Sequence, residues 1–229
     1  MRDFHYFCST MKNKALENYL NTEILRRYAH FDAAHRLDHV TLVMEQSKYL
    51  AEVISASPNY RNPDGTKMLI DTDMALTIAA YHDTGLCESR ETHHLVSGQI
   101  IRSDAHLKEW FTLEQIETMA QAAEDHRASA KGEPRSIYGR IVAEADRAID
   151  SYSIIRRTVQ YGVAHYPQLN KDQQFTRALE HLHEKYAEGG YLKLWIPESP
   201  NGERLAQLRA IIHDEDKLRK IFEDIWKNL

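Results

Sequence analysis

Tyr81-His82-Asp83-Thr84-Gly85 ends an apolar run that begins at Met74 and leads into a polar loop. An imidazole and a carboxylate side by side at the end of a buried helix cost free energy unless both are paired or bind a metal. With 13 histidines in the chain, one adjacent His-Asp pair is expected by chance, and a second pair stands at His213-Asp214. The side chains that accompany each pair therefore decide which pair is functional.

The composition is that of an ordinary globular protein. The 229 residues, 42% of them hydrophobic and 28% charged, are enough for one sizeable core, or for one core with a helical appendage. A net charge of −5 argues against general nucleic-acid binding. The sequence shows no membrane span and no signal peptide, and its two cysteines, Cys8 and Cys87, do not suggest a structural disulfide. We expect a cytoplasmic protein.

Helical periodicity dominates the chain, and no alternating strand pattern competes with it. The expected helices cover 11–29, 37–54, 70–83, 93–109, 112–125, 137–159, 171–187 and 202–228. Thr112 with Gln115 forms a capping box, and Ser136 is the N-cap of the helix after it. The pattern predicts an all-α fold with a helical domain over 1–160. A helical extension over 161–229 packs on that domain or forms a lid.

Histidines and carboxylates gather at the ends or inward faces of these helices. In chain order they are His39, His82, Asp83, His93 or His94, His126 and Asp146. Five helices of a bundle can direct such groups to one point. Ligands of this kind, without cysteine, suit Fe, Mn, Ni, Co, Zn or Mg, and up to six ligands favour two ions over one. In that case Asp83 bridges the ions, and a hydroxide between them is the nucleophile.

Each member of this set also has a simpler interpretation. A single histidine on an apolar face is more often a satisfied core or surface residue, and Asp146 can act as a cap for a neighbouring helix. Asp214 reads as the N-cap of a new helical segment, which removes the second His-Asp pair from consideration. The metal hypothesis depends on the groups occurring together in order.

Charged side chains next to the expected ligands are candidates for substrate contact. The phosphate substrate that a family resemblance implies must have its charge neutralised during attack. Arg90 and Arg127 are the best candidates, because they flank ligands on both sides of the pocket. Other candidates for substrate contact are His94, Lys131, Arg135 and Arg147, with solvated surface charge as the alternative for the cations. Glu124 and Asp125 are expected to accept hydrogen bonds from a ligand histidine. Asp150, four residues after Asp146, is expected to do the same or to pair with Arg147.

The order of His39, His82-Asp83 and Asp146 resembles the HD superfamily of metal-dependent phosphohydrolases. The additional His126 and His93 or His94 resemble its dinuclear branch. The similar phrases, which resemble a bacterial subfamily of unassigned substrate, are Phe31-Asp-Ala-Ala-His35, Asp38-His39-Val40, Ala79-Ala-Tyr-His-Asp83, Arg90-Glu-Thr-His-His94, Glu124-Asp-His-Arg127 and Ala143-Glu-Ala-Asp-Arg147. The resemblance covers about residues 20–155, and none of its motifs lies after about 160.

This resemblance implies an HD-domain helical bundle that binds divalent metal and hydrolyses a phosphate ester or anhydride. It assigns the first metal to His39, His82, Asp83 and Asp146. It assigns the second to His126 and one of the 93/94 pair, and Ser97-Gly98 downstream favours His93. The catalytic group would comprise Asp83, Arg90, Glu124 and Arg127.

The leading hypothesis is a phosphohydrolase of a small phosphorylated molecule such as a nucleotide, compatible with a homodimer. One alternative is a di-iron oxygenase, because some relatives with the six-ligand pattern use it for O₂ chemistry. Another is a non-catalytic domain that senses a nucleotide. A cyclic-dinucleotide phosphodiesterase is disfavoured, because the Gly-Tyr-Pro signature of that branch is absent from the sequence.

Overall fold

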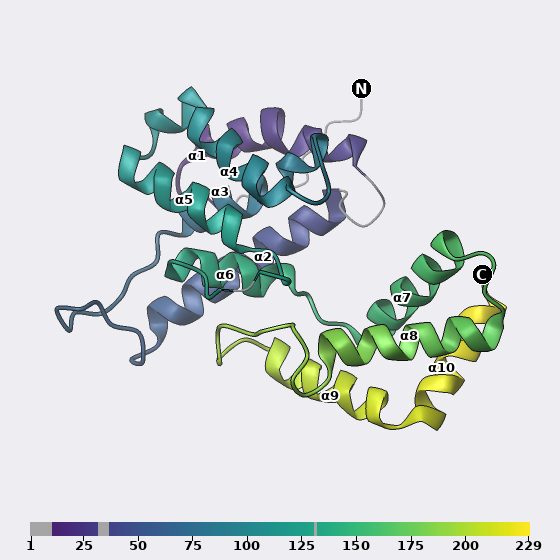
Figure 1. Cartoon of the computed structure of the whole chain (residues 1–229). Helices are drawn as coiled ribbons and strands as arrows, with labels where there is room; N and C mark the ends of the chain where they lie inside the picture. Colours follow the sequence, from purple (N-terminus) through teal and green to yellow (C-terminus); the bar gives the residue numbers. More distant parts are fainter. Residues whose placement is uncertain (1–10, 32–36, 131) are drawn as a thin grey trace. The chain divides into compact units, whose positions relative to one another are not determined.

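A computed structural model describes residues 11–31, 37–130 and 132–229. The chain forms two compact units, Met1–Arg147 and Ala148–Leu229 (Figure 1). In the described ranges the regular elements are helices, and the β structure is limited to an isolated bridge between Arg61 and Lys67. The expectation of an all-α fold is confirmed.

The first unit contains the helices that carry the expected ligands. In chain order its elements are α1 (Lys14–Tyr19), the π-helical turn η1 (Leu20–Ile24), the 3₁₀ turn η2 (Leu25–His30), α2 (Leu37–Ala56), α3 (Thr72–Tyr81), the 3₁₀ turn η3 (Thr84–Cys87), α4 (His93–Ser103), the 3₁₀ turn η4 (Ala105–Glu109), α5 (Leu113–Asp125) and α6 (Ile137–Asp146).

The centre of this unit is α3, whose residues from Met74 to Tyr81 are all buried. A helix that is apolar on every side must be surrounded, and α3 packs against α2, α5 and α6 (Figure 1). Asp71 begins the helix, because its carboxylate accepts the Met74 N–H at 3.2 Å. The His-Asp pair thus stands at the end of the most buried helix of the unit.

Two tyrosine hydroxyls fix the C-terminal end of α3, next to the His-Asp pair. The hydroxyls of Tyr81 and Tyr19 donate to the same carboxylate oxygen of Asp104, at 2.5 and 2.6 Å. Burial and the adjacent Asp104 raise the pKa of Tyr19 to about 12 and the pKa of Tyr81 above its ordinary value, so both hydroxyls keep the protons they donate. The residue before His82 is therefore tied to the segment that follows α4.

Four of the expected helices are interrupted, among them 202–228, which divides into two helices at Asp214. The segment 11–29 changes from α to π to 3₁₀ geometry, although its apolar stripe of Leu16, Leu20 and Ile24 stays buried. The helix expected over 93–109 ends at Ser103, because the Asp104 side chain accepts the His106 N–H at 3.0 Å and competes with the helical hydrogen bonds.

The single helix expected over 137–159 is two helices. After α6, the helix α7 (Ser151–His165) begins afresh, with the Asp150 carboxylate accepting the Ser153 N–H at 2.8 Å. Asp150 is therefore an N-cap and does not share a helical face with Asp146. The chain divides between Arg147 and Ala148, earlier than the boundary expected at 160, because α7 packs on the helices that follow it.

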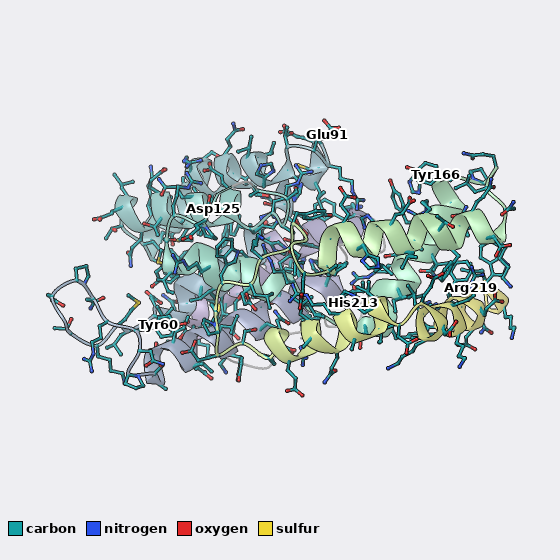
Figure 2. The ribbon with its side chains drawn as sticks, turned by 60° about the horizontal axis from the view of Figure 1, so that its bottom comes forward. Tyr60, Glu91, Asp125, Tyr166, His213 and Arg219 are labelled. Atoms are coloured by element: carbon teal, nitrogen blue, oxygen red, sulfur yellow. The ribbon has the colours of Figure 1, made fainter. Side chains whose placement is uncertain are left out.

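The second unit consists of α7, α8 (Lys171–Tyr186), α9 (Asn201–His213) and α10 (Glu215–Lys227). Its core includes Phe175 and Phe222, whose rings meet edge to face at 5.3 Å. Asp214 accepts the Lys217 N–H at 3.0 Å, which confirms it as the N-cap of α10. His213 ends α9 and Arg219 lies in α10 (Figure 2). The second His-Asp pair is thus a helix junction.

Other local predictions also hold. Thr112 and Gln115 form the capping box of α5, and Ser136 caps α6. Residues 57–71 form a loop that is exposed or half-buried at every position except the buried Ile70, that carries Tyr60 (Figure 2) and that has Gly65 in the left-handed region at φ 82°. Across the described residues, no helix is both long and apolar enough to cross a bilayer.

The loop after the His-Asp pair lies against the start of α4. The Gly85 N–H donates to Ser97 Oγ at 2.9 Å. A Cβ added at Gly85 would stand 2.1 Å from the His93 carbonyl oxygen and 2.7 Å from the Ser97 nitrogen. Both neighbours are backbone atoms of a packed helix, so glycine is required for this close approach.

We expect Gly85→Ala to destabilise the protein by about 1–3 kcal/mol, because the new methyl group must displace α4. Chemical denaturation followed by circular dichroism measures this change. Gly202→Ala is the matched control, because a Cβ there meets nothing within 4 Å. Equal stability of the two variants would contradict the close packing of Gly85 on α4.

Candidate metal centre

Six side chains of the first unit converge at the ends of its central helices. They are His39 from the first turn of α2, His82 and Asp83 from the end of α3, His93 from the start of α4, His126 from the end of α5 and Asp146 from the end of α6. Each ligand candidate lies at or near a helix terminus, so the packing of the bundle sets its position.

The two oxygens of Asp83 divide the cluster. Its Oδ2 lies 3.2 Å from His82 Nε2 and 3.5 Å from His39 Nε2. Its Oδ1 lies 3.4 Å from both His93 Nε2 and His126 Nε2. Asp146 Oδ1 joins the first group, 3.3 Å from His39 Nε2. The result is two groups of ligand atoms that share Asp83.

Backbone carbonyls orient three of the imidazoles. The Nδ1 atoms of His82, His93 and His126 lie 2.7, 2.8 and 2.6 Å from the carbonyl oxygens of Ala79, Arg90 and Ala123. In each case the acceptor lies three residues earlier. A proton on Nδ1 leaves the Nε2 lone pair directed at the cluster, as a metal ligand requires.

Helix termination makes these carbonyls available. His82 follows the last residue of α3, and His126 follows the last residue of α5. The last carbonyls of a helix have no N–H donor within the helix. The ring of the capping histidine satisfies one of them and is held in place by it.

The cluster is buried on one side and more open on the other. The side chain of His82 is fully buried and that of Asp83 is 4% exposed, whereas His39 is 17% and Asp146 24% exposed. Access to the ligand atoms is therefore greatest beside His39 and Asp146.

Electrostatics favour ionised carboxylates here. Burial alone would raise the pKa of Asp83, but its interactions with His82, His126 and His39 hold it well below its ordinary value. Burial opposes protonation of His39, yet Asp146 and Asp83 outweigh it and raise the pKa of His39 to about 10. Burial, together with His126, lowers the pKa of His93 to about 4. In the metal-free protein, a proton on His39 therefore balances part of the negative charge of Asp83 and Asp146.

The donor set fits divalent metal. His82 Nε2 is buried and makes no hydrogen bond, although it faces Asp83 and Asp146. A buried imidazole nitrogen left in this way needs a partner. Four imidazoles and two carboxylates, of which Asp83 belongs to both groups, could hold two ions.

The structure separates His93 from His94. His93 Nε2 lies 3.2 Å from His126 Nε2 and belongs to the second group. His94 belongs to neither group, and its ring centre is 5.6 Å from that of His93. Burial lowers the pKa of His94, with smaller contributions from His126 and Arg127.

Glu124 does not orient a histidine, contrary to expectation. Its two oxygens pair with Arg102 at 2.5 Å and Arg135 at 2.6 Å. Asp125 also pairs with Arg135, at 2.8 Å (Figure 2). The backbone carbonyl of Ala123 orients the His126 ring instead, because its oxygen lies 2.6 Å from His126 Nδ1 at the end of α5. Glu124 therefore joins α4 to the loop before α6.

The expected substrate-binding cations have different environments. The side chain of Arg90 is exposed. Arg127 donates to the Glu91 carbonyl oxygen at 2.6 Å, on the loop before α4 (Figure 2). Arg147 is buried, and its guanidinium donates hydrogen bonds from Nη1 to the backbone carbonyl oxygens of Ala143 and His126. Lys131 lies outside the described residues.

Sequence reasoning missed Tyr28, next to the cluster, and Arg102, in the network around it. The Tyr28 hydroxyl contacts the backbone of Ala80 and Asp83, and Arg102 holds Glu124. Neither carries a motif. Tyr28 lies on the buried stripe of its helical segment. A buried tyrosine hydroxyl usually needs a hydrogen-bond partner, and this need is the one feature of the sequence that could have indicated its role.

We expect His93→Ala to remove about one of two bound ions, whereas His94→Ala retains both, because of these two neighbours it is His93 that lies beside Asp83 Oδ1. Plasma mass spectrometry of the purified variants measures metal per chain. The adjacent histidines form a matched pair, since each loses one imidazole from the first turn of α4. Loss of metal in His94→Ala alone would contradict the assignment.

Comparison with known proteins gives one family. The model of the HD domain matches residues 36–149, a span that contains all six clustered side chains. No curated protein and no solved structure matches the chain. With this match, and with the histidine and aspartate cluster at the helix ends of an all-α unit, the chain belongs to the HD-domain superfamily of metal-dependent phosphohydrolases.

Proposed function

We propose that this protein hydrolyses a small phosphorylated molecule, such as a nucleotide, at two divalent ions that share Asp83. The observation that carries the proposal is the division of ligands between the two oxygens of that carboxylate. His39, His82 and Asp146 would complete the first site, and His93 and His126 the second. A divalent ion supplies Lewis acidity, which lowers the pKa of water and neutralises phosphate charge.

The charge of the site supports a phosphate substrate. Two carboxylates with four neutral imidazoles give a net charge of about −2, and two divalent ions would reverse it to about +2. Asp83 and Asp146 would thus hold the ions and cancel only about half of their charge. An anion would meet a positive site at the exposed side, beside His39 and Asp146.

Two arginines extend this attraction. Arg90 and Arg127 lie on segments that carry ligands: the Arg90 carbonyl accepts from His93, and Arg127 follows His126 directly. We propose that Arg90 contacts the substrate phosphate. Arg127, which donates to the Glu91 carbonyl, holds the same loop in place and adds positive charge there. Catalysis by Glu124 is not part of this proposal, because two arginines occupy its carboxylate.

The test is phosphate release from a panel of nucleotides and phosphate esters in the presence of Mn²⁺, Co²⁺, Ni²⁺ or Mg²⁺. We expect metal-dependent release by the wild-type protein and a loss of at least ~100-fold in Asp83→Asn, because the amide cannot bridge two cations. Asp214→Asn is the matched control: it changes the other His-Asp pair and should retain activity.

Metal analysis of the aerobically purified protein separates this function from its alternatives. Two irons per chain, with substrate-dependent O₂ uptake and no phosphate release, would identify a di-iron oxygenase on the same ligands. Nucleotide binding without turnover under every metal would indicate a sensor. Either result contradicts the proposed hydrolase.

A further inference from the structure

The hydroxyl of Tyr28 lies at the end of α3. Tyr28 belongs to η2 and is fully buried. Its hydroxyl donates to the Ala80 carbonyl oxygen at 2.9 Å, and it accepts the Asp83 N–H at 3.3 Å. One side chain from a segment 55 residues away thus contacts the backbone of the shared ligand.

The Asp83 N–H needs this acceptor because the helix has ended. In a continuing helix it would donate to the Ala79 carbonyl. That carbonyl is the acceptor for His82 Nδ1, and Asp83 has left the helical conformation, with φ −108° and ψ 5°. A buried N–H without a partner costs free energy comparable to a lost hydrogen bond.

Side chains replace the next helical turn at this point. The carbonyls of Ala79, Ala80 and Tyr81 accept from His82, Tyr28 and Thr84 respectively. The hydrogen bonds from His82 and Thr84 are local, because each donor lies three residues after its acceptor. Of these three donors, Tyr28 is the one that comes from another element, and its hydroxyl also contacts Asp83.

We propose that Tyr28 is a positioning residue for the shared carboxylate. By holding the Asp83 backbone out of the helix, it directs one carboxylate oxygen to each histidine group. The inference rests on the proposed function, in which Asp83 is the ligand of both ions. Burial and the charge of Asp83 raise the pKa of Tyr28 well above its ordinary value, so the hydroxyl keeps the proton that it donates to Ala80.

The test removes the hydroxyl and keeps the ring. We expect Tyr28→Phe to weaken Co²⁺ binding by about 10–100-fold, since partners that orient ligands have effects of this size. Tyr138→Phe is the matched control, because its hydroxyl accepts the Asp71 N–H at 3.0 Å at the other end of α3. Co²⁺ titration followed by visible absorption should show the wild-type affinity in Tyr138→Phe.

A second readout requires no metal. Amide hydrogen exchange at Asp83 in the metal-free protein should be faster in Tyr28→Phe than in wild type, and unchanged in Tyr138→Phe. Wild-type Co²⁺ affinity in Tyr28→Phe, or an equal loss in both variants, overturns the inference. If Tyr28→Phe does not fold, hydrogen exchange in the wild-type protein still tests the inference. An Asp83 amide that exchanges as fast as the amides of the loop 57–71 overturns the inference, and an Asp83 amide as protected as those of α3 supports it.

The two proposals fail separately. A folded wild-type protein that binds no Co²⁺ overturns the proposed function, while the exchange comparison still measures the hydrogen bond from Asp83 to Tyr28. Normal metal binding and phosphate release in Tyr28→Phe overturns the positioning role and leaves the proposed function intact.

Discussion

The first unit depends on one buried carboxylate. Asp83 lies within 3.2 to 3.5 Å of four imidazole nitrogens, one from each of His39, His82, His93 and His126. An isolated charge in such a place would be several kcal/mol unfavourable, and it is tolerated only with good partners on every side. Four segments must therefore end at the same point, and this requirement explains why ligand candidates stand at the helix termini.

Helix termination serves two purposes in this unit. It directs the side chains of His82 and His126 toward the cluster, and it frees the carbonyls of Ala79 and Ala123 to hold their rings. Ligands on packed helices are held more accurately than ligands on loops. Gly85 completes the arrangement, because it lets the chain after Asp83 lie directly against α4.

Charge is distributed in two layers. Around the ligands, carboxylates exceed permanent cations, so the cluster attracts protons or metal ions. Behind α4 and α5, Arg102 and Arg135 are paired with carboxylates, and Glu124 lies between them. That outer network links α4, α5 and the loop before α6. It stabilises the walls of the site and, because its charges are paired, adds little free positive charge to it.

The sequence by itself determined the helical class, the buried status of 74–81, several caps and the set of candidate ligands, because each of these is a local property of periodicity or residue type. Tertiary structure decided the rest. It placed His93 beside Asp83 and left His94 outside both ligand groups, and it paired Glu124 with two arginines. It also put the unit boundary at Arg147, because Asp150 caps a new helix. Tyr28 and Asp83 are 55 residues apart, and such contacts leave no trace in local periodicity, since only the packed bundle brings their backbone and side-chain groups together.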